Sequence, residues 1–370
     1  MNTSQWLVHI GIVPLAIVSI IIAMITISEH VVKYPNKTEK LLLLQVIFAN
    51  GEQDSLPFIP QSSSDADIYW LNESSVLSLQ GQKRAFKLGK AIKNIYQLYL
   101  QNYDFSYDLV YSSTGYLNIL QATLQCVHAG LFPTFPGAQI INVNLDWRPV
   151  PYEVYPKNDD IYIYQTEVLK TLRDLRVNGQ NDSMYETQLK KTLDVISNII
   201  KFNASLSDVV MINDYLNIQN KFRKLSNEWN EIWPGDTTAL VNEFWKEFAS
   251  HAQPSAVPLL NVFLENIKKK IANELPTARK LHLFSAHRLS LVEILSGLES
   301  WDILNGTITP CSYILLEMVQ EFATGYYKIH FYFGNGTEVD QPRPFTPKRC
   351  ANETCTIFEF TKIVNGLTLL

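Results

Sequence analysis

The feature that most constrains the fold is a short, almost wholly apolar run over residues 40–48, KLLLLQVIF. It is too short for a typical helix and continuously apolar in its middle, so we interpret it as a strand buried on both faces of a sheet. A helical run follows Ser78, which is a candidate N-cap. A second strand at 107–114 and a second helical run at 117–131 come next. This order predicts an α/β fold with a mostly parallel sheet flanked by helices.

The sequence pattern changes at the segment DWRPVPYEVYP, residues 146–156, where three prolines require an extended backbone. Residues 157–275 contain several helical runs and few strand-like ones. The strand pattern resumes in KLHLFSAHR, and YYKIHFYFGNG ends in a glycine turn typical of a hairpin. We therefore expect one α/β core formed by residues 35–156 and 276–370, interrupted by an inserted helical cap at 157–275.

The N-terminal stretch WLVHIGIVPLAIVSIIIAMITI, Trp6 to Ile27, is long enough to cross a bilayer, for which about 20 apolar residues suffice. It lacks the positively charged flank of an ordinary signal peptide, whereas Thr26 and Ser28 offer small residues for cleavage. Residues 1–30 are therefore either a cleaved signal peptide or a retained signal-anchor, which would be an N-terminal membrane anchor.

Candidate N-glycosylation acceptors are spread along the chain, away from the apolar runs. Downstream of the leader, the Asn-x-Ser/Thr pattern occurs at Asn36, Asn72, Asn181, Asn203, Asn305, Asn335 and Asn352. Together with the leader, these sites favour a secreted, extracellular or lumenal glycoprotein.

The four cysteines fit an oxidising compartment in part. Cys350 and Cys355 are close enough in sequence to form a local disulfide. Cys126 and Cys311 are not obvious partners, and Cys126 lies in an apolar helical stretch where a buried free thiol is the simpler interpretation.

Charge and motif content exclude several functional classes. The formal net charge of -5 gives no basic field, so nucleic acid is not an expected partner. No P-loop or GxSxG elbow occurs, and His128, His251 and His330 have no zinc-site spacing. We therefore expect no metal or cofactor. His282 lies in an apolar strand. A histidine of the core or of an interface, with its hydrogen bonds satisfied, is therefore a simpler interpretation than a metal or substrate ligand.

Polar residues follow three of the expected strands. They are Ala49-Asn50-Gly51, Ser112-Ser113-Thr114, and Ser285-Ala286-His287-Arg288. Ligands of open α/β sheets bind at the carboxyl ends of the strands, so these residues are the candidate site.

Six fragments in order resemble the histidine acid phosphatases, in particular the insect venom, prostatic and lysosomal types. The fragments are LSLQGQKRAFKLG, VYSST, AGLFP, DWRPVP, PLLNVFLENI and LFSAHR. The similarity extends from Glu39 to Ile363. It implies the histidine phosphatase fold and, in an intact member, hydrolysis of phosphomonoesters.

The resemblance also implies what the strand ends should contain. The family's first strand ends in Arg-His-Gly-x-Arg-x-Pro, whose histidine attacks phosphorus and whose arginines hold the phosphate. Ala49, Asn50 and Gln53 stand at those three positions. Ser112 stands where a further phosphate arginine precedes Ser-Thr. The family's late His-Asp pair, whose aspartate protonates the leaving group, is His287-Arg288 here.

A site without the nucleophile, the basic cradle and the acid cannot run the family mechanism. We therefore predict a pseudoenzyme that acts by binding an unknown protein partner or a weakly held phosphate or other anion. His287 and Arg288 are the anion-binding candidates. The alternative is an acid phosphatase working through a rearranged site, formed by Glu52, Asp54, His287 and Arg288, in which a carboxylate and the histidine would do general acid-base work. A homodimer remains open.

Overall fold

The computed structural model of the chain describes residues 38–53, 76–100, 106–133, 147–162, 184–221, 225–304, 308–351 and 354–368. The expected leader at 1–30 lies outside these residues. Within them, no helix combines the length and the apolar character needed to cross a membrane.

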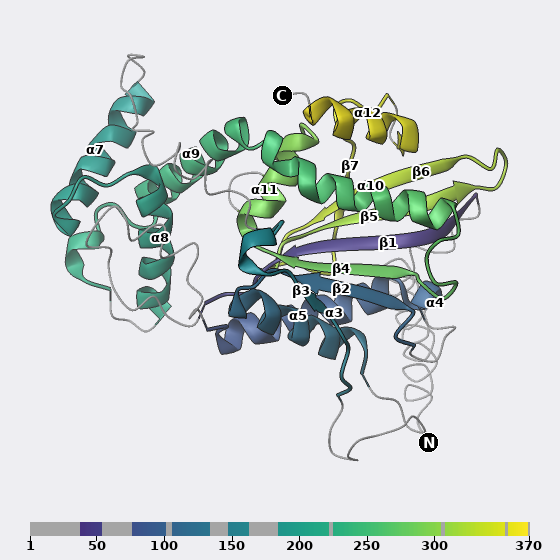
Figure 1. Cartoon of the computed structure of the whole chain (residues 1–370). Coiled ribbons are helices and arrows are strands. Elements are labelled where there is room, and N and C mark those ends of the chain that lie inside the picture. Colours follow the sequence, from purple (N-terminus) through teal and green to yellow (C-terminus); the bar gives the residue numbers. More distant parts are fainter. Residues whose placement is uncertain are drawn as a thin grey trace, which may run out of the picture.

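A single sheet organises the fold, with the strand order β3-β2-β4-β1-β5-β6-β7 and β8 paired to β6 (Figure 1). Its strands are β1 (Glu39–Ala49), β2 (Val110–Thr114), β3 (Glu153–Val154), β4 (Leu281–Ala286), β5 (Tyr313–Glu321), β6 (Tyr327–Gly334), β7 (Arg343–Phe345) and β8 (Cys355–Thr356). The first four are parallel, and the last four extend the sheet antiparallel. The α/β fold with a parallel core and flanking helices is thus confirmed.

Strand β1 joins the two halves of the sheet. It pairs in parallel with β4, where Ala49 faces Ala286, and antiparallel with β5, where Phe48 faces Tyr313. Its residues are buried on both faces, with Val46 packed in one apolar cluster and Ile47 in the other. A strand covered on both sides must be apolar throughout, which explains the run from which the fold was predicted.

Helices α3 (Leu79–Ile95) and α5 (Asn118–Leu131) cover one face of the sheet (Figure 1). The expected cap of α3 is present, because the Gly81 N–H donates to Ser78 Oγ at 2.9 Å. The two helices approach closely at glycines. A Cβ on Gly89 would lie 2.1 Å from the Val127 carbonyl oxygen, and one on Gly130 would lie 2.1 Å from that of Phe86.

The opposite face is covered by α10 (Val257–Ile271), α11 (Arg288–Gly297) and α12 (Ile357–Leu367). Helix α10 is tied to β1 because Gln45 Nε2 donates to the Phe263 carbonyl oxygen at 3.0 Å. Helices α7 (Met184–Ile200), α8 (Leu206–Lys221) and α9 (Gly235–His251) lie beyond the end of the sheet (Figure 1). The division into a core and a cap at residues 157–275 stays a prediction.

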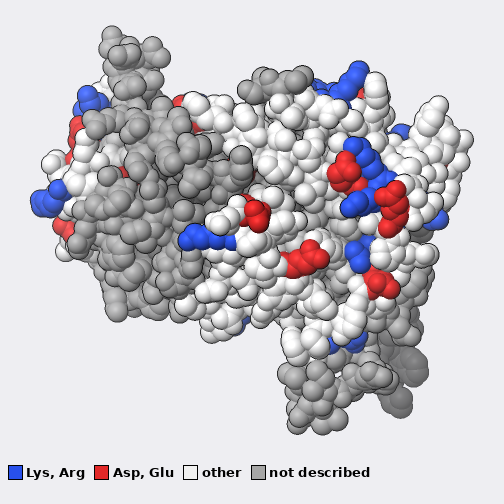
Figure 2. Space-filling model, viewed as in Figure 1, with Lys and Arg blue, Asp and Glu red and all other residues white. Residues whose placement is uncertain are grey.

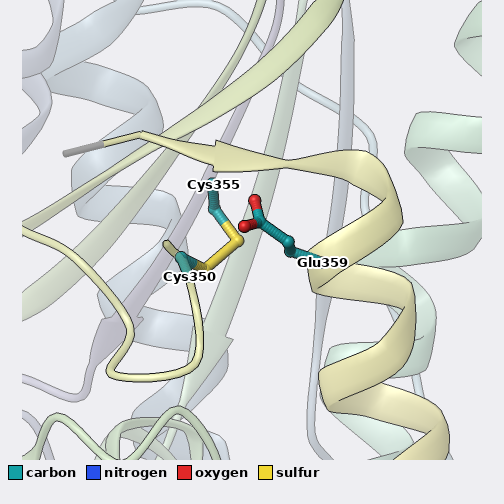
Figure 3. A group of neighbouring side chains, drawn as sticks. All are labelled: Cys350, Cys355 and Glu359. Carbon is teal, nitrogen blue, oxygen red and sulfur yellow. A yellow bond between two sulfur atoms is a disulfide. The ribbon is translucent and has the colours of Figure 1, made fainter. Parts of the chain in front are cut away.

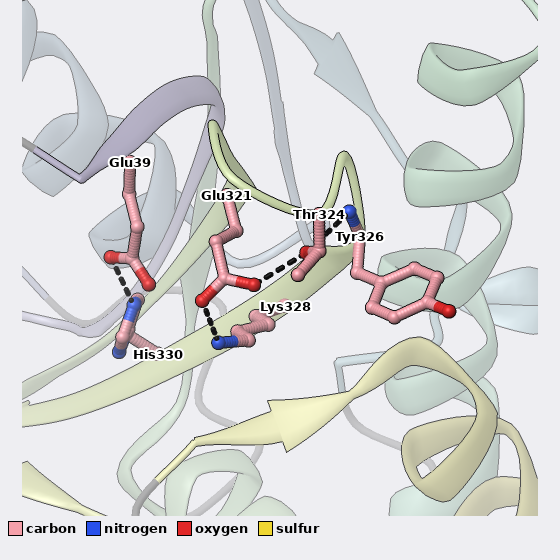
Figure 4. Close-up of polar contacts among 6 residues, drawn as sticks. All are labelled: Glu39, Glu321, Thr324, Tyr326, Lys328 and His330. Carbon is pink, nitrogen blue, oxygen red and sulfur yellow. Dashed lines mark hydrogen bonds and ion pairs between the residues drawn. The ribbon is translucent and has the colours of Figure 1, made fainter.

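The sequence did not reveal β5, although β6 was expected in a hairpin. Both of the pairings that place β5, with β1 and with β6, link residues separated by a turn or by most of the chain. Polar contacts hold the far end of this hairpin (Figure 4). His330 Nε2 lies 3.0 Å from Glu39 Oε2, and Lys328 Nζ lies 2.7 Å from Glu321 Oε1.

Cys350 and Cys355 form the expected disulfide. Glu359 lies beside it (Figure 3). This trio has the spacing of a metal site, but both sulfur atoms are bonded to each other, and Glu359 Oε2 accepts from the Thr356 N–H as part of the capping box of α12. Cys126 and Cys311 are free thiols. Burial raises the pKa of Cys311 to about 12, so this thiol is unreactive.

Candidate functional site

The three polar strand ends predicted from the sequence lie at the same edge of the sheet. Strand β4 lies between β1 and β2, with Ala286 level with Ala49 and Ser285 level with Thr114. The chain after β1 is fixed on both sides, because Asn50 N–H donates to the Ala286 carbonyl at 3.0 Å and Cys311 N–H donates to the Asn50 carbonyl at 3.1 Å. The backbone of a strand-end site is therefore present.

Asn50 turns its side chain back on its own loop. Its Nδ2 donates to the Gly51 carbonyl at 2.9 Å, and its Oδ1 is buried without a hydrogen-bond partner among the described residues. Glycine is favoured at position 51, because a Cβ on Gly51 would lie 2.5 Å from Leu77 Cδ1 and 3.1 Å from the Gly81 carbonyl oxygen, so Leu77 would have to move. Gln53 forms an isolated bridge with Leu77, so the turn closes against the start of α3.

The serines of β2 are used in buried contacts on opposite faces of the sheet. Ser112 Oγ lies 2.8 Å from His128 Nε2 on α5, and both side chains are buried. Burial lowers the pKa of His128 to about 3, so this histidine is neutral. Ser113 Oγ lies 2.7 Å from the Tyr162 hydroxyl on the other face. The Ser112–His128 pair is a packing contact. Ser112 is buried, and it does not lie on the exposed strand-to-helix turn that carries the nucleophile of a serine hydrolase.

His287 is the N-cap of α11. The Leu289 N–H donates to His287 Nδ1 at 3.3 Å, which requires that nitrogen to be unprotonated. Burial, and then the neighbouring charge of Arg288, lower the pKa of His287 to about 3. The imidazole is therefore neutral at any pH at which an acid phosphatase would work.

Arg288 points toward the helices beyond the sheet. Its Nη2 lies 2.7 Å from Asp214 Oδ2 on α8, and its guanidinium lies 5.9 Å from the centre of the Trp245 ring on α9. Helix α11 is thereby linked to both α8 and α9. The positive charge expected to hold an anion already has a carboxylate partner.

Comparisons with known proteins agree with this architecture. No family model matches the chain. Lysosomal acid phosphatase of Xenopus laevis is 21% identical over 350 residues, which cover 90% of this chain and 77% of that protein. Hafnia alvei phytase superposes with a TM-score of 0.62 at 11% identity, over 90% of this chain and 98% of that one. Bifidobacterium longum multiple inositol polyphosphate phosphatase, complexed with inositol hexasulfate, gives 0.55 at 10% identity, over 90% and 93%.

In sequence the chain is similar to a lysosomal acid phosphatase, and in fold it is similar to phosphatases and phytases of the histidine acid phosphatase type. The family's catalytic positions can therefore be compared with the residues that occupy them. The resemblance predicts that Ala49, Gln53 and Asn50 stand at the positions of two phosphate arginines and the nucleophile, and none of the three carries a charge. Ser112, at the further arginine position, is bonded to His128.

Charge is mixed on the face that Figure 2 shows: among the described residues there, basic and acidic side chains lie beside one another without a large area of one sign. Arg84 lies near the turn, since its charge lowers the pKa of Cys311, but Glu52 acts on the same thiol in the opposite direction. Of the predicted acid-base group, Asp54 lies outside the described residues.

Two residues that bear on the site, both aspartates, were missed by sequence reasoning. Asp160 accepts from the Tyr116 and Tyr162 N–H groups, each at 2.8 Å, and so fixes the loop after β2. Asp214 pairs with Arg288 across 74 residues of sequence. No local pattern marks either aspartate. His282 was expected to be a satisfied core histidine, and that is wrong in one respect: it is buried, but neither ring nitrogen has a partner among the described residues.

Proposed function

We propose that this chain is a catalytically inactive member of the histidine acid phosphatase family that acts by binding. The observation that carries the proposal is Asn50, a buried carboxamide at the position of the family's nucleophilic histidine. A carboxamide has no basic lone pair with which to attack phosphorus. In a well-studied protease, loss of the nucleophile costs on the order of 10⁶ in turnover.

The surroundings of Asn50 support the same conclusion. A phosphomonoester dianion needs positive charge around its oxygens, and arginine supplies paired donors in a fixed geometry. Ala49 and Gln53 supply none. Arg288 is paired with Asp214, and His287 is neutral. A weakly held phosphate or other anion at His287 and Arg288, or a protein partner, remain the binding modes we propose to test.

We propose that the protein acts in a secreted or lumenal compartment. It would be either free there or tethered to the membrane by its N-terminal segment. The leader and the seven sequons downstream of it support that location, as does the lysosomal name of the Xenopus relative. The disulfide fits an oxidising environment.

The test is an assay of purified, folded protein with para-nitrophenyl phosphate at acid pH. We expect product release no faster than in a protein-free blank. The outcome that would overturn the proposal is turnover that His287→Ala abolishes and His251→Ala leaves intact. His251 is the matched control because it is an exposed histidine at the end of α9, and circular dichroism would establish that both variants are folded.

A further inference from the structure

A hollow of about 590 Å³ opens at the same end of the sheet as Asn50, but on its antiparallel side. It is lined by Leu304, Thr309, Asn335, Glu338, Gln341, Pro342, Arg343 and Pro344. Its position follows from the register, because Gly334 at the end of β6 pairs with Tyr313, and Tyr313 pairs with Phe48. Its volume is within the range of sites that hold small molecules.

Asn335, one wall of this hollow, has its carboxamide oxygen fully used. Oδ1 accepts from Thr309 Oγ1 at 2.6 Å, and from the N–H and the hydroxyl of Thr337, each at 3.0 Å. Because the carboxamide is planar, these donors fix its orientation and leave Nδ2 on the other side. Nδ2 donates no hydrogen bond to any described residue.

The same asparagine is the acceptor of the sequon Asn335-Gly336-Thr337. N-linked glycans are attached to that nitrogen. The native bonds of Oδ1 can therefore persist after Nδ2 is modified. Asn335 is only half-buried, so the attached group has a route out of the protein.

The chemistry of the hollow suits a sugar. Glu338 and Gln341 present a carboxylate and a carboxamide, which can bond hydroxyl and acetamido groups. Pro342 and Pro344 offer apolar faces of the kind that pack against a pyranose ring. Arg343 is held in place by a bond from its Nη2 to the Ile303 carbonyl at 3.0 Å.

We propose that the first sugars of an N-linked glycan on Asn335 occupy this hollow and become part of the folded surface. The glycan comes from a lipid-linked oligosaccharide diphosphate during synthesis. Its anomeric C1–O bond breaks, a C1–Nδ2 bond forms, Nδ2 loses one proton, and the lipid diphosphate leaves. The inference rests on the lumenal location proposed above.

The test uses the full chain made in secretory cells that leave high-mannose glycans. Glycopeptide mass spectrometry measures occupancy at Asn335 and at Asn203, an exposed sequon between α7 and α8 that serves as the matched control. The folded protein is then treated with an endoglycosidase that cuts between the first two sugars. An Asn305→Gln variant keeps the neighbouring sequon out of the assay, because Asn305 directly follows Leu304.

We expect both sites to be occupied and the Asn335 glycan to be released at least about tenfold more slowly than the Asn203 glycan, since buried first sugars exclude the enzyme. Glu338→Ala combined with Gln341→Ala should bring the two rates together. Equal rates in the parent chain, or occupancy of Asn203 alone, would overturn the inference. Occupancy of neither site would overturn the lumenal location as well, so the two failures are distinguishable.

Discussion

Arg288 Nη2 lies 2.7 Å from Asp214 Oδ2, and this ion pair joins the helix that begins at the candidate site to a helix beyond the sheet. Arg288 is largely buried, so the pair is shielded from solvent more than a surface ion pair is. The contact explains how an arginine can replace the family's catalytic acid without leaving an unpaired charge. It also places a carboxylate against the charge that the candidate site would offer to an anion.

Asp214→Asn should lower the free energy of unfolding by about 1–3 kcal/mol, because it removes the carboxylate charge that pairs with Arg288. It should also make Arg288 available to an anion. Inorganic phosphate is therefore expected to raise the melting temperature of the variant more than that of the parent, because a ligand that binds only the native state stabilises it.

The control is Glu265→Gln, which breaks the exposed ion pair with Lys268 on α10. It should cost under about 1 kcal/mol and leave the phosphate response unchanged. A parent protein that phosphate already stabilises as much as the variant would contradict this role of Asp214.

Asn50→His returns the family's nucleophile to the end of β1. We expect no measurable release of para-nitrophenol, because Ala49 and Gln53 still provide no charge to bind the phosphate and Arg288 cannot act as an acid. The measurement is the same assay at acid pH, with Asn50→Gln as a control for changes in packing. Turnover in the histidine variant alone would mean that a functional phosphate cradle persists.

His282→Phe should stabilise the protein, and by more at acid pH. Replacing a buried ring with two unpartnered nitrogens by an apolar ring removes a penalty of about 1–3 kcal/mol at neutral pH. Burial and, to a smaller extent, the charges of Arg279, Lys270 and Lys269 together lower the pKa of His282 from 6.5 to about 3.

The sign of the pH effect follows from proton uptake. Below pH 6.5 the unfolded chain binds a proton at His282 that the folded chain does not, so parent stability falls as the pH drops toward 3. The advantage of the phenylalanine variant should therefore grow by about 1.4 kcal/mol per pH unit in that window. Urea unfolding at neutral pH and near pH 5 measures it. If the stability advantage of His282→Phe is the same at both pH values, the prediction is wrong.

Gly89→Ala and Gly130→Ala should each destabilise the protein by about 1–3 kcal/mol or more, because a methyl group at either position collides with backbone of the other helix. Gly235→Ala is the matched control. It lies at the start of α9, where a Cβ would meet nothing within 4 Å, and should be neutral or slightly stabilising. The measurement is the melting temperature of each of the three variants in thermal unfolding. Equal melting temperatures would show that α3 and α5 can separate at little cost.

Much of the parallel half of the fold could be read from the sequence. The apolar run of β1, the capped start of α3 and the strands β2 and β4 all lie where their patterns predict. Such elements are marked locally, by periodicity and by a serine cap. The convergence of their polar ends at one edge followed from the parallel order alone.

The antiparallel half was harder to predict. The β5 strand is apolar enough to belong to either a strand or a buried helix, and only its pairing with β1 and β6 settles the choice. The hollow beside Asn335 is likewise formed by segments on either side of β5 and β6, whose approach no local pattern encodes.

By itself the sequence determined which residues stand at the candidate site: Asn50 in place of a nucleophile, and no arginine at Ala49 or Gln53. Identity and chain order suffice for that conclusion. Only the tertiary structure decided how His287 and Arg288 are used, because their protonation and pairing depend on burial and on a carboxylate brought in from α8. Whether a buried charge is balanced depends on the groups that lie near it in space, and folding decides which groups those are.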